Sequence, residues 1–174
     1  MIELPTVLIG NILIVYYSLS SFKKPLTHGF YRFFAWEIIL IQFALNEATW
    51  FKESFAWHQW ISWLLLLISI IFLIESIYLI KKIGKPATTF ETTTKLVTIG
   101  IYKLIRHPMY ASLLFLTWGI FFKSPSALDF SLALISTFFL YATARMDEME
   151  CIRKFGNDYL GYMKVSRMFI PYLF

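Results

Sequence analysis

Charged residues and cysteine are scarce in this sequence. Charged side chains make up 16% of its 174 residues, whereas an ordinary water-soluble domain carries roughly 25%. The single cysteine, Cys151, cannot form an internal disulfide, which excludes a small disulfide-bonded scaffold. Internal repeats, low-complexity segments and cysteine–histidine clusters with metal spacing are absent too, so no metal site is expected. What remains is 58% hydrophobic and 20% aromatic, a composition that excludes a disordered chain and favours a membrane protein.

Five apolar runs predict an all-α integral membrane helical bundle with about five transmembrane helices. They cover residues 4–22, 30–51, 57–80, 109–122 and 130–144. No lysine or arginine precedes the first run and no small-residue cleavage site follows it, so we expect a retained helix rather than a secretory signal. The last two runs, of 14 and 15 residues, are shorter than a bilayer core of roughly 30 Å requires. We interpret them as a short helical hairpin that either crosses the membrane or re-enters it.

The positive charges predict how these helices are oriented. With five spans, one side of the membrane holds fourteen lysines and arginines, whereas the other side holds only Lys52 and Lys123. Cytoplasmic loops carry the excess of basic residues, so we expect the N-terminus outside, and the C-terminus and any active site in the cytoplasm. The net charge of +5 then reflects basic loops that face anionic membrane lipids, and no nucleic-acid partner is expected.

The sequence divides into two parts, residues 1–80 with three spans and residues 81–174 with the hairpin and two polar cytoplasmic segments. In the first part and at its end, three acidic residues interrupt the apolar runs, and we expect them to hydrogen-bond between helices: Glu37, Glu47 and Glu75. In the tail, apolar residues recur at helical spacing: Tyr159, Tyr162, Met163 and Phe169. This spacing predicts an amphipathic cytoplasmic segment at the membrane surface, acting either as a lid or as an anchor.

The two polar segments, residues 81–110 and 145–171, flank the hairpin. A hairpin that crosses and returns brings its two ends together, so the arginine–histidine pair 106–107 should lie close to the acidic pair 147–148. Ionisable groups at a membrane face are costly and usually functional. The alternatives are that the basic pair only anchors the chain and that the acidic group forms a solvated helix face.

These segments carry the motifs LVTIGIYKLIRHPMY at residues 96–110 and DEMECIRKFGNDYLGYM at residues 147–163, followed by RMFIP at residues 167–171. With these motifs the sequence resembles the isoprenylcysteine carboxyl methyltransferase family and its phospholipid methyltransferase relatives. Members of that family are integral-membrane enzymes that use S-adenosyl-L-methionine. The resemblance covers roughly the last half of the chain, and the N-terminal spans match only as apolar helices.

The resemblance implies a cofactor pocket at the cytoplasmic membrane face, built from both segments. The implied cofactor contacts are Lys95, Leu96, Val97, Gly100, Tyr102, His107, Pro108, Met109, Tyr110, Asp147 and Glu148. The family also has an arginine that holds the acceptor's carboxylate, and here either Arg106 or Arg145 can take that place. These two arginines and Glu148 form the implied catalytic set.

The resemblance implies methyl transfer from S-adenosyl-L-methionine to a lipophilic acceptor that enters from the bilayer. Carboxyl O-methylation of an isoprenylcysteine-like substrate is the first expectation, since a carboxylate needs only orientation and desolvation. N-methylation of a phospholipid or other amine is the alternative, with Glu148 or His107 as base. An NADPH-dependent sterol-type reductase shares the arginine–histidine–proline triplet, but the residues that follow it here, 109–112, disfavour reduction. A membrane protein without catalysis is the remaining rival.

Overall fold

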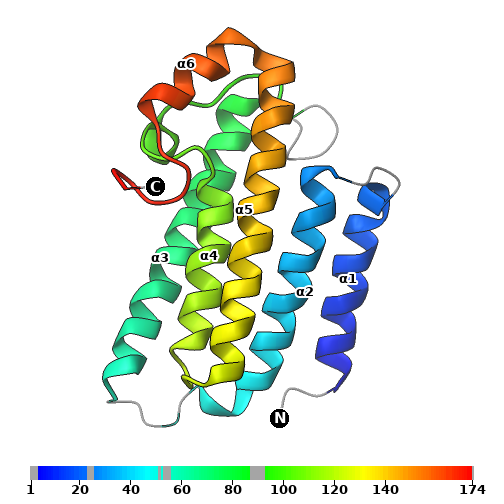
Figure 1. Cartoon of the computed structure of the whole chain (residues 1–174), viewed down its shortest axis with the longest axis vertical. Coiled ribbons are helices and arrows are strands. Elements are labelled where there is room, and N and C mark those ends of the chain that lie inside the picture. The colour runs from blue at the N-terminus through cyan, green and yellow to red at the C-terminus, as the bar shows by residue number, and fades with distance from the viewer. Residues whose placement is uncertain (1–3, 23–25, 51, 53–55, 87–92, 174) are drawn as a thin grey trace.

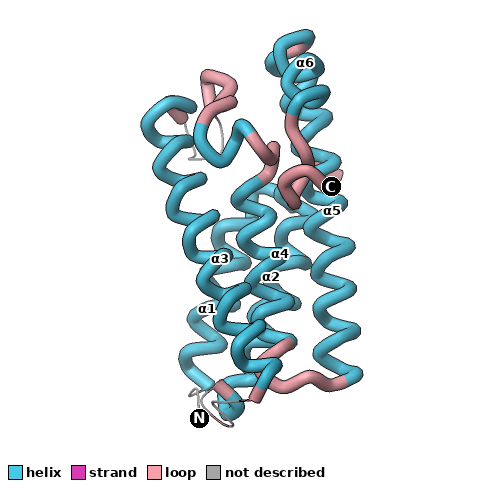
Figure 2. The backbone as a smooth tube through the Cα atoms, turned by 90° about the vertical axis from the view of Figure 1, so that its left-hand side faces the viewer, coloured by secondary structure: helices cyan, strands magenta, loops and turns pink. Residues whose placement is uncertain are grey.

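The chain folds into helices joined by loops. The structure is a computed structural model that describes residues 4–22, 26–50, 52, 56–86 and 93–173. Its elements, in order, are α1 (Leu4–Phe22), α2 (His28–Asn46), η1 (Glu47–Thr49), α3 (Trp57–Leu79), the π-helix η2 (Ile80–Gly84), η3 (Gly100–Lys103), α4 (Pro108–Phe121), α5 (Ala127–Phe155) and α6 (Asn157–Val165). Within these ranges no strand is present, as Figure 2 shows. The predicted all-α class is therefore confirmed.

Helices α1 to α5 run alternately up and down in one bundle (Figure 1). Helix α2 packs mainly on α5, and α3 packs mainly on α4, whereas α1 packs on α2 at the edge. The outward faces of α1, α3 and α5 carry apolar side chains that are more than half exposed, among them Ile12, Ile70 and Phe138. Exposed apolar surface of this extent is typical of contact with lipid.

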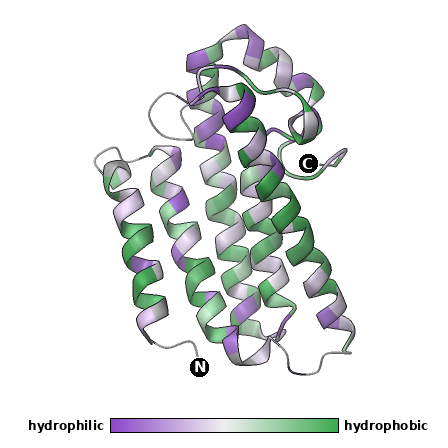
Figure 3. Cartoon of the chain, turned by 180° about the vertical axis from the view of Figure 1, so that it is seen from behind, coloured by the Kyte–Doolittle hydropathy of each residue, from purple (hydrophilic) through white to green (hydrophobic). Residues whose placement is uncertain are grey.

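Two helical stretches are long and apolar enough to cross a membrane. They are Trp57–Gly84 and Ala127–Phe155, and the shorter apolar helices are Val7–Leu19 and Pro108–Phe121. Figure 3 shows hydrophobic residues along the length of the bundle and hydrophilic residues gathered at the end that holds α6. The two ends of the molecule therefore differ in polarity, as the distribution of charges predicts.

The hairpin differs from its prediction in the length of its second helix. Helix α4 begins at Pro108, one residue before the predicted start, with proline in its first turn, where no N–H is needed. Helix α5, however, has 29 residues instead of 15, because the helix-forming residues after Ala144 contain no glycine or proline until Gly156. The acidic pair 147–148 therefore lies on a rigid helix and not in a loop.

Acidic residues within the bundle make the polar contacts expected of them. Glu37 of α2 accepts a hydrogen bond of 2.9 Å from Asn11 of α1. Glu75 of α3 accepts one of 3.0 Å from the backbone N–H of Ile101, at the start of η3. Both carboxylates thus join separate elements, as predicted.

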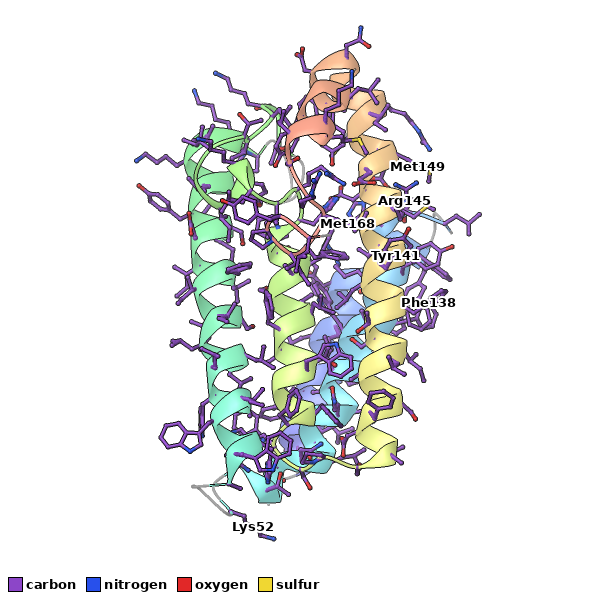
Figure 4. All side chains as sticks on the ribbon, turned by 60° about the vertical axis from the view of Figure 1, so that its left-hand side comes forward. Lys52, Phe138, Tyr141, Arg145, Met149 and Met168 are labelled. Atoms are coloured by element: carbon purple, nitrogen blue, oxygen red, sulfur yellow. The ribbon has the colours of Figure 1, made fainter. Side chains whose placement is uncertain are left out.

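Lys123, at the far end of the bundle, is 1% exposed although it lies in the turn between α4 and α5. Its Nζ lies 3.4 Å from the centre of the Trp63 ring and donates a 3.1 Å hydrogen bond to Gln59 Oε1. Among the described residues of that end, Lys52 is therefore the exposed cation, and Figure 4 shows it there. The charge difference between the two ends is sharper than the residue count suggests.

Gly156 makes the corner between α5 and α6. Its backbone has φ +55° and ψ −128°, a conformation that L side chains rarely adopt. This corner turns α6 over the end of the bundle (Figure 1), where Tyr159 and Tyr162 become buried. The position of both tyrosines thus depends on a glycine.

We expect Gly156→Ala to destabilise the protein by roughly 1–2 kcal/mol, because alanine strains a left-handed backbone. The melting temperature of the detergent-solubilised protein should fall by about 2–8 °C. Gly161→Ala is the matched control: it lies within α6 with no atom within 4 Å of the added Cβ, and it should stabilise α6 slightly. Equal melting temperatures for the two variants would contradict this account.

Candidate functional site

The C-terminal segment is bonded to the loop that precedes α4. Arg106 N–H donates to the Arg167 carbonyl at 2.7 Å, and His107 N–H donates to the Met168 carbonyl at 3.2 Å. In return, Arg167 N–H donates to the Leu104 carbonyl at 2.9 Å. These backbone bonds fix the arginine–histidine pair beneath the tail of the chain.

Glu148 is the buried centre of a charged cluster. It is 1% exposed, and its Oε1 accepts a 2.9 Å hydrogen bond from Arg106 Nε. Its Oε2 accepts a 2.8 Å hydrogen bond from Arg145 Nη1. A carboxylate buried between two guanidinium groups keeps its charge. The interpretation of this acidic residue as part of a solvated helix face is therefore wrong.

The two arginines differ in how many hydrogen bonds their guanidinium groups donate within the protein and in how exposed their side chains are. Arg106 also donates to the carbonyls of Met163 and Ser166, and its side chain is 10% exposed. The Arg145 side chain is 52% exposed and bonds Glu148 through Nη1. Arg106 therefore holds the structure together, whereas Arg145 retains donors that face outward.

His107 lies between two carboxylates. Its Nδ1 is 3.4 Å from Asp147 Oδ2, and its Nε2 is 3.6 Å from Glu148 Oε1. Burial alone favours the neutral ring, but the hydrogen bonds and charges of Asp147 and Glu148 outweigh it, and the pKa of His107 is raised above 6.5. His107 Nε2 is buried with no hydrogen-bond partner among the described residues. His107 Nε2 thus lies toward the Glu148 carboxylate without a hydrogen bond to it.

A cavity opens beside these residues, at the end of the bundle covered by α6. The cavity has a volume of about 100 Å³ and is partly open to solvent. Four tyrosines of the wall are buried, Tyr102, Tyr110, Tyr159 and Tyr162. Burial raises the pKa of Tyr102, Tyr159 and Tyr162, so these three phenols stay protonated. Tyr162 OH donates a 2.5 Å hydrogen bond to the Tyr102 carbonyl, which joins α6 to η3.

Most of the predicted cofactor contacts lie on the wall of this cavity. They are Leu96, Val97, Tyr102, His107, Pro108, Met109, Tyr110 and Asp147, together with Arg106. Glu148 lies behind His107 and Arg106, and Arg145 lies on the outer face of α5. Lys95 and Gly100 are both exposed outside the wall. Gly100 has φ +60°, and an added Cβ would lie 2.7 Å from Leu79. The backbone turn and the close packing therefore explain why glycine is found here.

The sequence analysis did not identify all of the wall. The cavity is also lined by His28, Ile80, Thr93, Cys151, Phe155, Tyr159 and Tyr162. The tail was expected at the membrane surface as either a lid or an anchor. Tyr159 and Phe169 are 3% exposed, and the Phe169 ring centre lies 6.3 Å from that of His107, which agrees with the lid. The tail therefore covers the site. His28 lies on α2, far from both motifs in sequence.

His28 forms an ion pair with Glu150 of α5. Its Nδ1 lies 2.8 Å from Glu150 Oε2, and its backbone N–H donates to Glu150 Oε1 at 3.3 Å. Donor atoms of His28, Glu150 and Asp147 all lie within 4.8 Å of one another. Because His28 Nδ1 and Glu150 Oε2 are already bonded to each other, we interpret these three residues as a histidine–carboxylate pair with Asp147 as a second carboxylate nearby.

His107 predicts a pH dependence of stability. A pKa that is higher in the folded than in the unfolded protein stabilises the fold below about 6.5, and this stabilisation is lost as pH rises through the raised value. We therefore expect the melting temperature to fall as the pH rises from about 6.5 through the raised pKa of His107. The part of this fall that His107 causes should vanish in His107→Gln. His58→Gln, at the far end of the bundle, should keep the wild-type slope. A wild-type slope retained in His107→Gln would contradict the assignment.

Comparison with known proteins gives distant relatives and one family. The chain is 33% identical over 73 residues to methanethiol S-methyltransferase of Pseudomonas deceptionensis, covering 42% of this chain and 27% of that protein. It is 29% identical over 90 residues to methanethiol S-methyltransferase 1 of Bradyrhizobium diazoefficiens, covering 52% of this chain and 30% of that protein. The chain thus matches less than a third of the length of these curated relatives. No solved structure matches it. The family profile described as phospholipid methyltransferase matches residues 57–157, more than half of the chain, and the chain therefore belongs to the phospholipid methyltransferase family.

Proposed function

We propose that the protein transfers a methyl group from S-adenosyl-L-methionine to a lipophilic acceptor at the membrane surface. The observation that carries this proposal is the cavity enclosed by residues 93–110, the end of α5 and α6. Both family motifs meet there, and buried charge and aromatic side chains line it. Membership of the phospholipid methyltransferase family supports the same reaction class.

The donor set of the cavity suits this cofactor. The cofactor carries an ammonium and a carboxylate, and Asp147 and Arg106 on the cavity wall are partners of opposite charge for them. Aromatic walls such as Tyr110, which stacks on His107 at 5.5 Å between ring centres, suit an adenine ring and a sulfonium. When bound, the cofactor supplies an electrophilic methyl group. The protein's own contribution is to bind, to orient the acceptor and to exclude water.

An apolar groove beside the cavity supports a lipophilic acceptor. It lies between α3, α4, α5 and the tail, with a volume of about 660 Å³. Its lining is Leu65, Leu114, Phe115, Trp118, Phe122, Leu134, Thr137, Phe138, Tyr141, Phe169 and Ile170. Phe169 also contacts the ring of His107, so the groove and the cavity are neighbours across one side chain. We infer that the acceptor's apolar part lies in this groove.

Arg145 stands above the groove on α5. In Figure 4, Phe138, Tyr141, Arg145 and Met149 follow one another along this helix. Because Arg106 is committed to Glu148 and two carbonyls, Arg145 is the better candidate to hold an anionic acceptor. An isoprenylcysteine-like carboxylate fits such a clamp, and a phospholipid amine is equally compatible with the family. The curated relatives are named for a thiol acceptor, which adds a lipophilic thiol as a candidate.

We further propose that all five bundle helices span the membrane, with the N-terminus outside and the site in the cytoplasm. The supporting observations are the exposed apolar side chains along α1, α3 and α5 and the polar residues gathered at the end with α6. The far end offers one exposed cation among the described residues, Lys52. This difference follows the positive-inside rule.

The proposal predicts that Leu134→Trp, which fills the groove, changes acceptor choice without changing cofactor binding. Methyl transfer from labelled S-adenosyl-L-methionine is measured with acceptors that share one reacting group and differ in alkyl chain length, from butyl to octyl. The wild-type kcat/KM should rise with chain length, by about fourfold for each buried methylene. In Leu134→Trp this rise should flatten, whereas the affinity for S-adenosylhomocysteine, measured by isothermal titration, should stay the same.

Leu128→Trp is the control, because this residue is exposed on the same helix outside the groove. It should behave as wild type in both measurements. A wild-type enzyme that bound S-adenosylhomocysteine but showed no dependence on chain length would refute the groove assignment. Absence of any cofactor binding would refute the proposed function itself.

A further inference from the structure

In the membrane position proposed above, helix α1 carries a polar side chain at the depth of the lipid tails. The helix has 19 residues, about 28 Å at 1.5 Å per residue, and Asn11 is the eighth of them. The Asn11 side chain is exposed and donates a 2.9 Å hydrogen bond to Glu37 Oε2 of α2. Its amide has a second N–H and a carbonyl oxygen, and among the described residues neither has a partner.

A second polar group lies five residues further along α1. Tyr16 is 72% exposed, and its hydroxyl makes no hydrogen bond within the part of the chain that the structure describes. Lipid tails offer neither donors nor acceptors, so a polar group left unsatisfied among them costs free energy. Asn11 and the Tyr16 hydroxyl are therefore groups that a second transmembrane helix can stabilise.

An apolar strip runs along α1 between these two polar side chains. Its members are separated by four, three and four residues, and three of the four are more than half exposed: Leu8, Ile12, Val15 and Leu19. This spacing is typical of two helices packed as a left-handed pair. In the heptad pattern the strip takes the central positions a and d, whereas Asn11 takes the flanking position g and Tyr16 the flanking position e.

The partner that this surface fits is a second copy of the chain. Copies inserted with the same orientation present α1 at the same depth, so the strip of one copy meets the strip of the other about a twofold axis. In a parallel pair of helices, a residue at position g lies beside the residue five places further along the other helix, at position e. Asn11 and Tyr16 have this separation, so the Asn11 carbonyl can accept from the Tyr16 hydroxyl of the second copy, and symmetry forms this bond twice.

We infer that the outward strip of α1 is a homodimer interface within the membrane, closed on each side by a hydrogen bond between Asn11 and Tyr16 of different copies. This inference uses the proposed membrane position of α1 and no step of the proposed reaction. Figure 1 shows α1 at one edge of the bundle and α3 at the opposite edge. Pairing through α1 therefore leaves the groove between α3, α4 and α5 open to lipid.

Disulfide cross-linking of the purified protein in liposomes tests the interface. In a Cys151→Ser background, which removes the natural thiol, Leu8→Cys is compared with Leu13→Cys. Both leucines are more than half exposed, but Leu13 lies outside the strip. Because a disulfide forms only between closely apposed residues, Leu8→Cys should give a band at twice the mass of the 20.5 kDa chain, and Leu13→Cys should not. Equal bands, or no band in Leu8→Cys, would overturn the inference.

Removing one hydroxyl tests the hydrogen bonds. The Leu8→Cys protein is equilibrated in glutathione buffer over a series of protein-to-lipid ratios, and the ratio at half dimerisation is measured. Tyr16→Phe should raise this ratio by roughly threefold to thirtyfold for each hydrogen bond lost. Tyr17→Phe is the matched control, since Tyr17 is 48% exposed and lies outside the strip, and it should leave the ratio unchanged. Equal ratios in the two variants would overturn the assignment of Asn11 and Tyr16.

The same liposomes separate this inference from the proposed function. Binding of S-adenosylhomocysteine is measured by isothermal titration on the wild-type protein. Binding without a specific Leu8→Cys dimer would overturn the interface and leave the proposed function standing. A specific dimer without binding would support the interface and refute the proposed function. In native membranes, a Leu8→Cys disulfide to a different protein in place of a second copy would also overturn the inference.

Discussion

The ion pair between Arg106 and Glu148 is the interaction on which the site depends. It joins the loop before α4 to the last turns of α5, and Arg106 extends it to the tail through the Met163 and Ser166 carbonyls. Two buried charges are stable only when each is fully paired, and removing one partner of such a pair costs roughly 3–5 kcal/mol. Backbone hydrogen bonds between residues 104–107 and residues 167–168 hold the loop against the tail around this ion pair. The cavity, the position of His107 and the fold of the tail therefore depend on the pairing.

Much of this arrangement is predictable from the sequence. Apolar runs predict the helices, and the hairpin places the arginine–histidine pair beside the acidic pair, which the structure confirms at 2.9 Å between Arg106 and Glu148. The length of α5 is not predictable from hydropathy, since its last residues are polar but still helical. The burial of Tyr159 depends on the turn at Gly156, a backbone feature without a periodic signal. His28 was missed because its partner Glu150 is 122 residues away.

The cavity and the apolar groove differ in polarity and in the surroundings that they face. The cavity beneath α6 is lined by apolar side chains together with charged and hydroxyl groups such as Asp147, Arg106 and Tyr102. The groove between α3, α4 and α5 is lined almost entirely by carbon and faces the apolar perimeter of the bundle. Phe169 contacts His107 and also lines the groove. In the reaction we propose, this arrangement lets a water-soluble methyl donor and a membrane-dissolved acceptor meet in one small protein.

The central claim is that the cavity under α6 binds S-adenosyl-L-methionine, and photochemical cross-linking tests it most directly. The protein in detergent is irradiated with cofactor that carries a labelled methyl group, and the labelled peptides are mapped by mass spectrometry. We expect the label within residues 93–110 or 147–163, and we expect S-adenosylhomocysteine to displace it while NADPH does not. Label confined to α1 or to the end of the bundle that holds Lys52, or displacement by NADPH alone, would contradict the account.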